Sequence, residues 1–256
     1  MKIGLCTIAF QELPLKDVLD IAAKSGFDGV EIWGKPPHTP MEYDIEYIKS
    51  VSQMAKEREL DIFSFGSYVN PLMENYKDQW NTAFNITENL GTEIMRVWSG
   101  GGPSSQMSED VKNKIFAVFG EMAEEAEKRE IILAIEMHGN NLTDKAENIV
   151  ALMEKINSPY LKTYYQPRFS EDADDPYKAA EMIGKYVVNV HAQNAKVEPD
   201  GKVTPCGISE GAVDYKRILK ILKSKGFDGY IEVEFVHGED KLKALKRDRD
   251  FLMEII

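Results

Sequence analysis

Cysteine and long apolar runs are scarce in this sequence. Its 256 residues include two cysteines, Cys6 and Cys206, which are too few for a disulfide framework and fit a reducing compartment. No apolar run approaches the roughly 18 residues that a membrane-spanning helix needs, and the amino-terminal segment becomes polar at Gln11. We therefore expect a cytoplasmic protein that neither crosses a membrane nor is anchored to one.

Positive charge is also in short supply. The chain has 31 lysines and arginines against 43 aspartates and glutamates, a formal net charge of −12. This balance repels a polyanion such as DNA unless a local basic patch offsets it, and the sequence contains no such patch. We expect no nucleic-acid partner. A small anionic substrate stays compatible with the sequence, because a bound metal can dominate the field inside a pocket.

Short β-rich runs alternate with longer stretches of helical periodicity, and the pattern occurs eight times. Spread over eight units, 256 residues give 32 residues per unit, about the size of one βα repeat. This spacing predicts an α/β protein with a single domain, residues 1–256, folded as a (β/α)8 TIM barrel. The expected strands are Lys2–Phe10, Gly29–Gly34, Asp61–Val69, Glu93–Ser99, Ile131–Gly139, Leu161–Arg168, Val187–Gln193 and Gly229–Val236.

Glycines mark the ends of two expected helices. Pro14–Ser25 is followed by Gly26, and Val213–Lys225 is followed by Gly226. An open doubly wound sheet is the alternative fold, but no Gly-x-Gly-x-x-Gly motif follows any expected strand. The closed barrel is therefore favoured.

The placement of histidine points to a functional site. The sequence has four histidines, His38, His138, His191 and His237, and each lies at or just beyond the carboxyl end of an expected strand. In a parallel barrel these ends meet at one mouth, where active sites are built. The alternative is that the histidines are scattered over the surface.

Side chains alternate along a strand, so Glu136 and His191 are expected to point into the barrel while their apolar neighbours face the helices. Glu232 and Glu234 of the last strand also point inward by this rule. Buried carboxylates are rare unless they are paired or bind a metal. Glu234, nearer the strand end, is the better candidate for a metal ligand, whereas Glu232 is expected to lie deeper and to pair with Lys162 or Arg96. The alternative is that both glutamates only form structural ion pairs.

Several segments across nearly the whole chain carry a resemblance to a known family. They are Gly29-Val30-Glu31-Ile32-Trp33-Gly34 with His38, Arg96-Val97, Glu136-Met137-His138-Gly139, His191, Glu210-Gly211 with Val213-Asp214-Tyr215, and Gly229-Tyr230-Ile231 through Glu234-Phe235. In these segments the sequence resembles the sugar phosphate isomerase/epimerase family, the xylose isomerase-like barrels. The resemblance implies one divalent cation held by Glu136, Gln166, His191 and Glu234. Gln166 departs from the aspartate that is commoner at its position, which removes one negative charge from the ligand set.

The implied reaction is isomerisation or epimerisation of a sugar-like substrate, with or without a phosphate group. Three oxygen donors and one imidazole suit Mn²⁺, Mg²⁺ or Co²⁺, and Zn²⁺ is also compatible. Glu136 and Glu234 are the expected proton carriers next to the substrate carbonyl, through an enediolate. The expected substrate-binding residues are Glu31, Trp33, His38, Trp98, His138 and Lys196. A homo-oligomer is compatible with the sequence.

Three other functions remain open at this point. Leu5-Cys6-Thr7-Ile8 and Asn141-Leu142-Thr143-Asp144 also resemble the dehydroshikimate dehydratases of the same superfamily, which implies a metal-dependent lyase. Abasic-site endonucleases share the fold, but they hold three metals with many histidines, and the acidic balance argues against DNA binding. The third alternative is a binding protein without catalytic activity.

Overall fold

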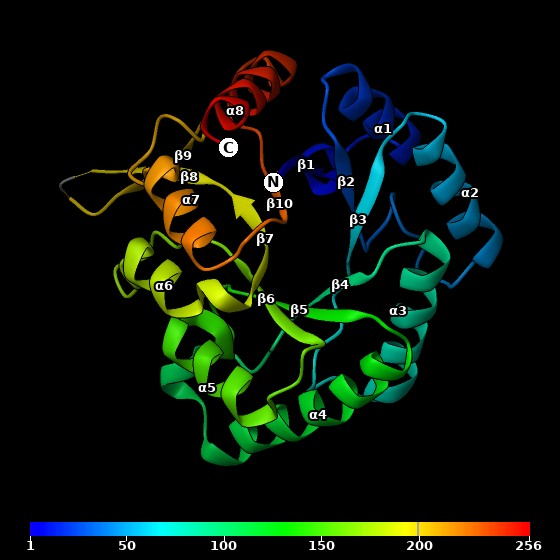
Figure 1. Cartoon of the computed structure of the whole chain (residues 1–256), viewed down its shortest axis with the longest axis vertical. Helices are drawn as coiled ribbons and strands as arrows, with labels where there is room; N and C mark the ends of the chain where they lie inside the picture. Colours follow the sequence, from blue (N-terminus) through cyan, green and yellow to red (C-terminus); the bar gives the residue numbers. More distant parts are fainter. Residues whose placement is uncertain (199) are drawn as a thin grey trace.

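Eight parallel strands close into a barrel, as the computed structural model of residues 1–198 and 200–256 shows (Figure 1). The strand order around the barrel is β1-β10-β7-β6-β5-β4-β3-β2. This closed sheet confirms the predicted (β/α)8 TIM barrel and rejects the open sheet. The barrel strands are β1 (Lys2–Cys6), β2 (Gly29–Trp33), β3 (Asp61–Gly66), β4 (Ile94–Val97), β5 (Ile132–Glu136), β6 (Leu161–Tyr165), β7 (Val187–Ala192) and β10 (Tyr230–Val233).

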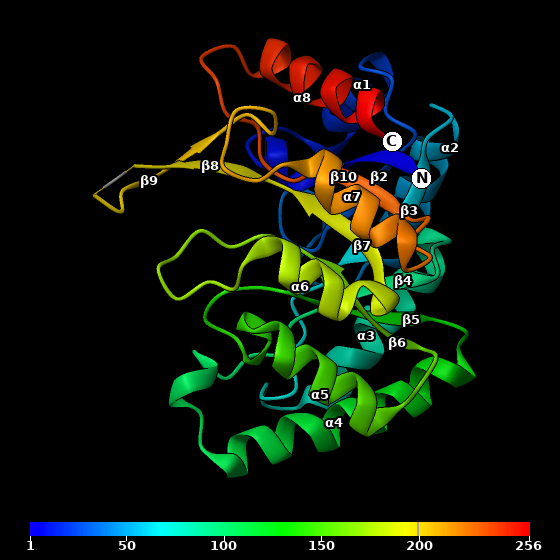
Figure 2. The ribbon, with the colours of Figure 1, turned by 60° about the vertical axis from the view of Figure 1, so that its left-hand side comes forward.

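Helices surround the barrel, and α8 lies beside α1, so the two ends of the chain are close together (Figures 1 and 2). Arg249 of α8 fixes this closure by donating hydrogen bonds to the carbonyl of Gly26. The α-helices are α1 (Leu15–Lys24), α2 (Ile45–Lys56), α3 (Tyr76–Leu90), α4 (Glu109–Lys128), α5 (Ala146–Ile156), α6 (Pro176–Ile183), α7 (Tyr215–Ser224) and α8 (Lys241–Ile255). Short 3-10 helices are η1 (Thr7–Phe10), η2 (Ser104–Gln106), η3 (Leu142–Asp144) and η4 (Gly184–Tyr186).

Local sequence explains where the helices start and stop. Asp44 caps α2 by accepting hydrogen bonds from the backbone N–H groups of Glu46 and Tyr47. Gly91 ends α3 with a φ of 77°, a left-handed conformation that a glycine adopts without strain. Among the described residues, no helix combines the length and the apolar character needed to cross a membrane.

Each expected strand contains one barrel strand, but the observed strands are shorter at their carboxyl ends. The residues in excess belong to the loops of the barrel mouth. The clearest case is Thr7–Phe10, which was expected to extend the first strand and instead forms the 3-10 helix η1. The mostly apolar residues of this segment fit one buried turn as well as they fit a strand, because short apolar runs do not distinguish the two.

A two-stranded antiparallel sheet, β8 (Asn194–Val197) and β9 (Val203–Cys206), projects from the barrel directly after β7 (Figure 2). This sheet is not among the elements expected from the sequence. Asn194 anchors its base, since the buried side chain donates to the carbonyls of Ile208 and Val213. Gly211 permits this contact, because a Cβ there would lie 2.2 Å from the Asn194 Oδ1 atom.

The alternation expected for the last strand is confirmed. Ile231 and Val233 belong to the hydrophobic core between the sheet and the helices. Glu232 and Glu234, on the other face, lie within 3.6 Å of the imidazole of His191 inside the barrel. The alternation of side chains along this strand therefore places two glutamates in the barrel interior.

Candidate metal centre

Four neighbouring strands carry the four residues expected to bind a metal. Along the barrel, β5, β6, β7 and β10 lie side by side. Glu136 is the last residue of β5, His191 belongs to β7, and Gln166 and Glu234 directly follow the ends of β6 and β10. All four side chains are buried, with Glu234 the most exposed at 7%. They form the mouth quartet.

The Nδ1 atom of His191 lies at the centre of the mouth quartet. It is 2.7 Å from Gln166 Oε1, 3.4 Å from Glu136 Oε1 and 3.6 Å from Glu234 Oε1. One ligand atom each from Glu136, His191 and Glu234 lies within 4.8 Å of the other two. The second oxygen of Glu234 is buried and has no hydrogen-bond partner among the described residues. These oxygen and nitrogen donors fit a divalent cation.

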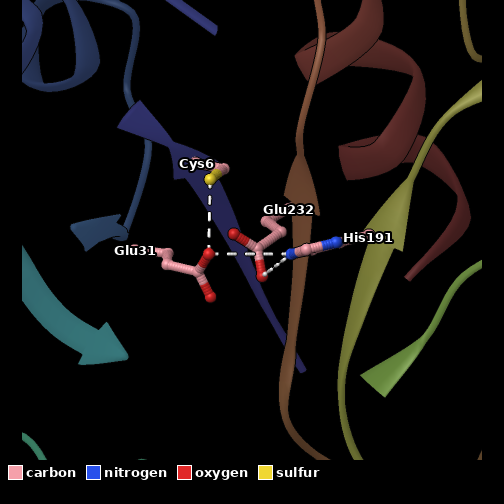
Figure 3. A group of neighbouring side chains, drawn as sticks. All are labelled: Cys6, Glu31, His191 and Glu232. Carbon is pink, nitrogen blue, oxygen red and sulfur yellow. Dashed lines mark hydrogen bonds and ion pairs between the residues drawn. The ribbon is translucent and has the colours of Figure 1, made fainter. Parts of the chain in front are cut away.

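The Nε2 atom of the same imidazole faces a second group deeper in the barrel (Figure 3). This inner cluster contains Cys6 of β1, Glu31 of β2, His191 and Glu232 of β10. Nε2 is 3.7 Å from Glu31 Oε1 and 3.5 Å from Glu232 Oε1. The Cys6 thiol donates to Glu31 Oε1 at 3.4 Å. His191 therefore separates two buried groups of carboxylates.

Arg96 of β4 joins the two groups from the opposite wall. Its Nε donates to Glu31 Oε1 at 2.9 Å, and its NH1 forms an ion pair with Glu136 Oε2. Gly66 of β3 makes room for this arrangement, because a Cβ there would lie 2.6 Å from both the Arg96 guanidinium and Glu31. The expected pairing of Glu232 with Lys162 or Arg96 is therefore wrong. Among the described residues, His191 is the one basic side chain within ion-pair distance of Glu232.

Burial and charge shift the pKa values in this interior strongly. Burial, together with the charge of Glu31, raises the pKa of Glu232 well above its ordinary range. Burial likewise raises the pKa of Glu234 to about 7. Although burial opposes it, Arg96 lowers the pKa of Glu136 to about 2. Four buried carboxyl groups thus face one guanidinium and one imidazole. The raised pKa values of Glu232 and Glu234 mean that both groups hold their protons more tightly than usual, and a divalent cation would favour their ionised forms.

An aromatic wall, formed by Trp33, Tyr68, Trp98 and His138, lies beside Arg96. Trp33 Nε1 donates to the Tyr68 hydroxyl at 2.7 Å. The ring of Trp98 stacks on Tyr68 at 5.6 Å and packs against His138 at 4.6 Å between centroids. Trp98 Nε1 is buried without a hydrogen-bond partner among the described residues. The wall brings together three of the expected substrate-binding residues.

The three other expected binding residues are not part of this wall, although the ring of His38 packs edge-on against Trp33 at 5.5 Å between centroids. Both nitrogens of the buried His38 ring have partners, Thr7 Oγ1 at 3.0 Å and the Leu13 carbonyl at 3.0 Å. This arrangement holds the loop after β2 and leaves neither nitrogen for a substrate. Lys196 is exposed on β8, outside the barrel. Glu31 lies in the inner cluster, where Arg96 and Cys6 already contact it.

Three residues of the site were not predicted from the sequence, namely Cys6 in the inner cluster, Arg96 as the bridge, and Tyr68 in the wall. The sequence could have indicated the role of Arg96. Alternation along β4 points its side chain into the barrel, and a buried arginine almost always has an acidic partner. Alternation along β1 likewise points the side chain of Cys6 into the barrel. Tyr68 follows β3 in a loop, where alternation no longer indicates direction.

The chain matches a protein family over most of its length. Residues 19–255 match the model of the xylose isomerase-like TIM barrel. A 3-dehydroshikimate dehydratase from Bacillus anthracis is 21% identical over 265 residues, which cover 95% of each chain. A fructoselysine 3-epimerase from Escherichia coli O157:H7 is 22% identical over 282 residues, which cover 99% of each chain. The relatives therefore include an epimerase and a dehydratase.

Solved structures share the fold. A probable 3-DHS dehydratase from Bacillus anthracis superposes with a TM-score of 0.82 at 21% identity over 99% of each chain. A xylose isomerase-like TIM barrel protein from Mycobacterium smegmatis in complex with magnesium gives 0.81 at 15% identity, over 99% of this chain and 96% of that one. The IOLI protein with a zinc atom gives 0.81 at 17% identity, over 100% and 98%. Together with the family match, the closed barrel leads to one conclusion: this chain belongs to the xylose isomerase-like TIM barrel family.

Proposed function

We propose that this protein is a divalent-metal-dependent isomerase or epimerase that moves a proton next to the carbonyl of a sugar-like substrate. One observation carries the proposal. Glu136 and Glu234 come from the two ends of the four-strand arc and face the same imidazole nitrogen, Nδ1 of His191, at 3.4 and 3.6 Å. Two carboxylates on different sides of one point suit the removal of a proton and its return on the other face of the substrate.

The mouth quartet is the proposed metal site. Glu136, Gln166, His191 and Glu234 would hold the ion, and Mn²⁺, Mg²⁺ or Co²⁺ suit its oxygen-rich donors, with Zn²⁺ also compatible. The magnesium and zinc found in two proteins of the same fold support this assignment. A bound divalent cation supplies positive charge beside the substrate oxygens as negative charge develops on them.

The remaining residues have roles that follow from their contacts. Arg96 keeps Glu136 ionised and fixed in place through their ion pair. Trp98 and Trp33 offer flat apolar surfaces to the faces of a sugar, and His138 borders the same wall. We keep Lys196 as the candidate for an anionic group on the substrate, such as a phosphate.

Dehydration is the second candidate reaction. The Bacillus anthracis dehydratase is 21% identical over 95% of each chain, a similarity close to that of the epimerase. Both reactions begin with abstraction of a proton, so the geometry of Glu136 and Glu234 serves either one. Product analysis separates them: dehydration yields a conjugated product with a new absorbance, whereas isomerisation yields a product of unchanged mass.

The test combines metal analysis with isotope exchange. Protein purified without chelators should contain a divalent metal at the mouth, and incubation with a panel of ketoses in deuterated water should introduce deuterium beside the carbonyl of one of them. A protein that binds no metal and exchanges no sugar proton would be a binding protein. Cleavage of an abasic DNA duplex that is lost on mutation of His191 would instead favour the endonuclease alternative.

A further inference from the structure

The inner cluster is the most unusual feature outside the mouth quartet. Glu232 is fully buried, and neither of its carboxylate oxygens has a hydrogen-bond partner among the described residues. His191 Nε2 and Glu31 Oε2 are also buried, and neither has a hydrogen-bond partner in the part of the chain that the structure describes. Unsatisfied buried groups of this kind are rare, and each costs free energy unless something else binds it. The thiol of Cys6 points into the same space (Figure 3).

We propose that Cys6, Glu31, His191 and Glu232 form a second cation site, which binds a thiolate-preferring divalent ion such as Zn²⁺ or Co²⁺. This site goes beyond the proposed function, since it shares only the imidazole of His191 with the mouth quartet. His191 offers Nε2 to the inner site and Nδ1 to the mouth, and when both ions are bound the imidazole releases its N–H proton to solvent and bridges them as an imidazolate.

The spacing of the donor atoms fits a tetrahedral ion. Zinc bonds of about 2.0 Å to nitrogen and oxygen and about 2.3 Å to sulfur place tetrahedral ligand atoms roughly 3.3–3.7 Å apart. The observed separations are 3.4 Å between Cys6 Sγ and Glu31 Oε1, 3.7 Å between Nε2 and Glu31 Oε1, and 3.5 Å between Nε2 and Glu232 Oε1. One ligand atom from each residue lies within 4.8 Å of the other three. Little movement is therefore needed to bind the ion.

Charge balance supports the same site. Arg96 donates to Glu31 Oε1, the oxygen whose distances fit the ion, so it brings one positive charge to the cluster, while Glu31 Oε2 has no hydrogen-bond partner among the described residues. Metal binding must release two protons, one from the Cys6 thiol and one from Glu232, because burial raises the pKa of both groups. The thiolate, Glu31 and Glu232 then carry three negative charges. A divalent ion and Arg96 carry three positive charges. The mouth quartet has only oxygen and nitrogen donors, whereas the thiolate of Cys6 gives the inner site a stronger preference for Zn²⁺ and Co²⁺ over Mg²⁺ and Mn²⁺.

Cobalt spectroscopy tests this site independently of catalysis. We start from Cys206→Ser, which removes the other thiol of the chain, strip the metal and titrate with Co²⁺. A thiolate-to-cobalt charge-transfer band in the near ultraviolet should reach saturation by two equivalents, because the mouth quartet also accepts Co²⁺, and should disappear when excess Zn²⁺ is added. The further change Cys6→Ser should abolish the band, and Glu232→Gln should weaken Co²⁺ binding by at least about tenfold. Glu234→Gln, a change in the mouth quartet, should keep the band.

Absence of the band in the Cys206→Ser protein, or its persistence after Cys6→Ser, would overturn the proposal. If Cys6→Ser does not fold, X-ray absorption of the zinc-loaded Cys206→Ser protein decides instead. One sulfur neighbour at about 2.3 Å supports the inner site, and a shell of only oxygen and nitrogen contradicts it. Loss of the band with normal sugar exchange would refute the inner site alone, whereas a band without any exchange would refute only the proposed function.

Discussion

The two ends of the barrel differ in how their polar side chains are satisfied. At the amino-terminal end, the rings of Phe63 and Tyr230 stack with centroids 4.0 Å apart, and Tyr230 donates to Asp61 at 2.5 Å. At the mouth end, Glu232, Glu234 and His191 are buried and keep unpartnered polar atoms. The first end is closed by satisfied contacts, which stabilise the fold. The second keeps buried polar atoms without partners among the described residues, which agrees with the general placement of functional sites at this face of such barrels.

The largest expected effect lies at the mouth. Glu136→Gln and Glu234→Gln should each leave a folded protein whose proton exchange between sugar and solvent falls by a factor of about 10² to 10⁴, because an amide cannot accept the proton. Deuterium incorporation into a ketose that the wild-type protein exchanges measures this loss. Near-normal exchange in either variant would remove that glutamate from the reaction. Glu232→Gln is no neutral control, since Glu232 contacts the same imidazole as the mouth quartet.

Removing Arg96 should destabilise the folded protein at the mouth of the barrel. In Arg96→Met, Glu31 and Glu136 lose their buried cationic partner, and the free energy of unfolding should fall by about 3–5 kcal/mol. Added Mn²⁺ should restore part of the loss, because it binds only the folded protein. Urea denaturation with and without Mn²⁺ measures both effects. Arg129→Met is the matched control, which removes surface ion pairs with Glu88 and Glu125 and should cost less than about 1 kcal/mol.

A smaller effect is expected from crowding the amino-terminal end. A Cβ on Gly4 would lie 2.4 Å from the ring of Phe63, so Gly4→Ala should destabilise the fold by about 1–3 kcal/mol through overpacking. Thermal unfolding measures this, and exchange activity per folded molecule should stay near normal. The double change Gly4→Ala with Phe63→Leu should recover part of the stability, because the smaller side chain frees the space. Additive losses in the double variant would contradict this account.

The smallest effect concerns a surface contact at the same end. Hydrogen bonds from Lys2 and Tyr230 lower the pKa of Asp61 from its ordinary value of 3.8. A lowered pKa in the folded state means that the contact stabilises the protein above pH 3.8 and that this contribution is lost as the pH falls through the folded pKa. Because Asp61 is half exposed, Asp61→Asn should cost less than about 1 kcal/mol at neutral pH. Unfolding temperatures of the two proteins should converge at low pH, and a constant difference would contradict the assignment.

The sequence by itself determined the repeating units and the direction of single strands. Eight βα units set the barrel, and the period of two in the last strand placed Glu232 and Glu234 inside, since alternation is a property of one strand alone. The meeting of Glu136, Gln166, His191 and Glu234 was expected from the family resemblance and is visible in the structure, while metal binding by them stays a prediction.

Tertiary structure decided which inward side chains meet across the barrel. Arg96 pairs with Glu31 and Glu136 instead of Glu232, and Cys6 reaches Glu31 and Glu232 through the stagger between strands. That stagger depends on how the whole sheet tilts and closes, and no single strand encodes it. His38 shows the same limit in a loop, where contacts with Thr7 and Leu13, distant in sequence, turned an expected substrate contact into a structural one.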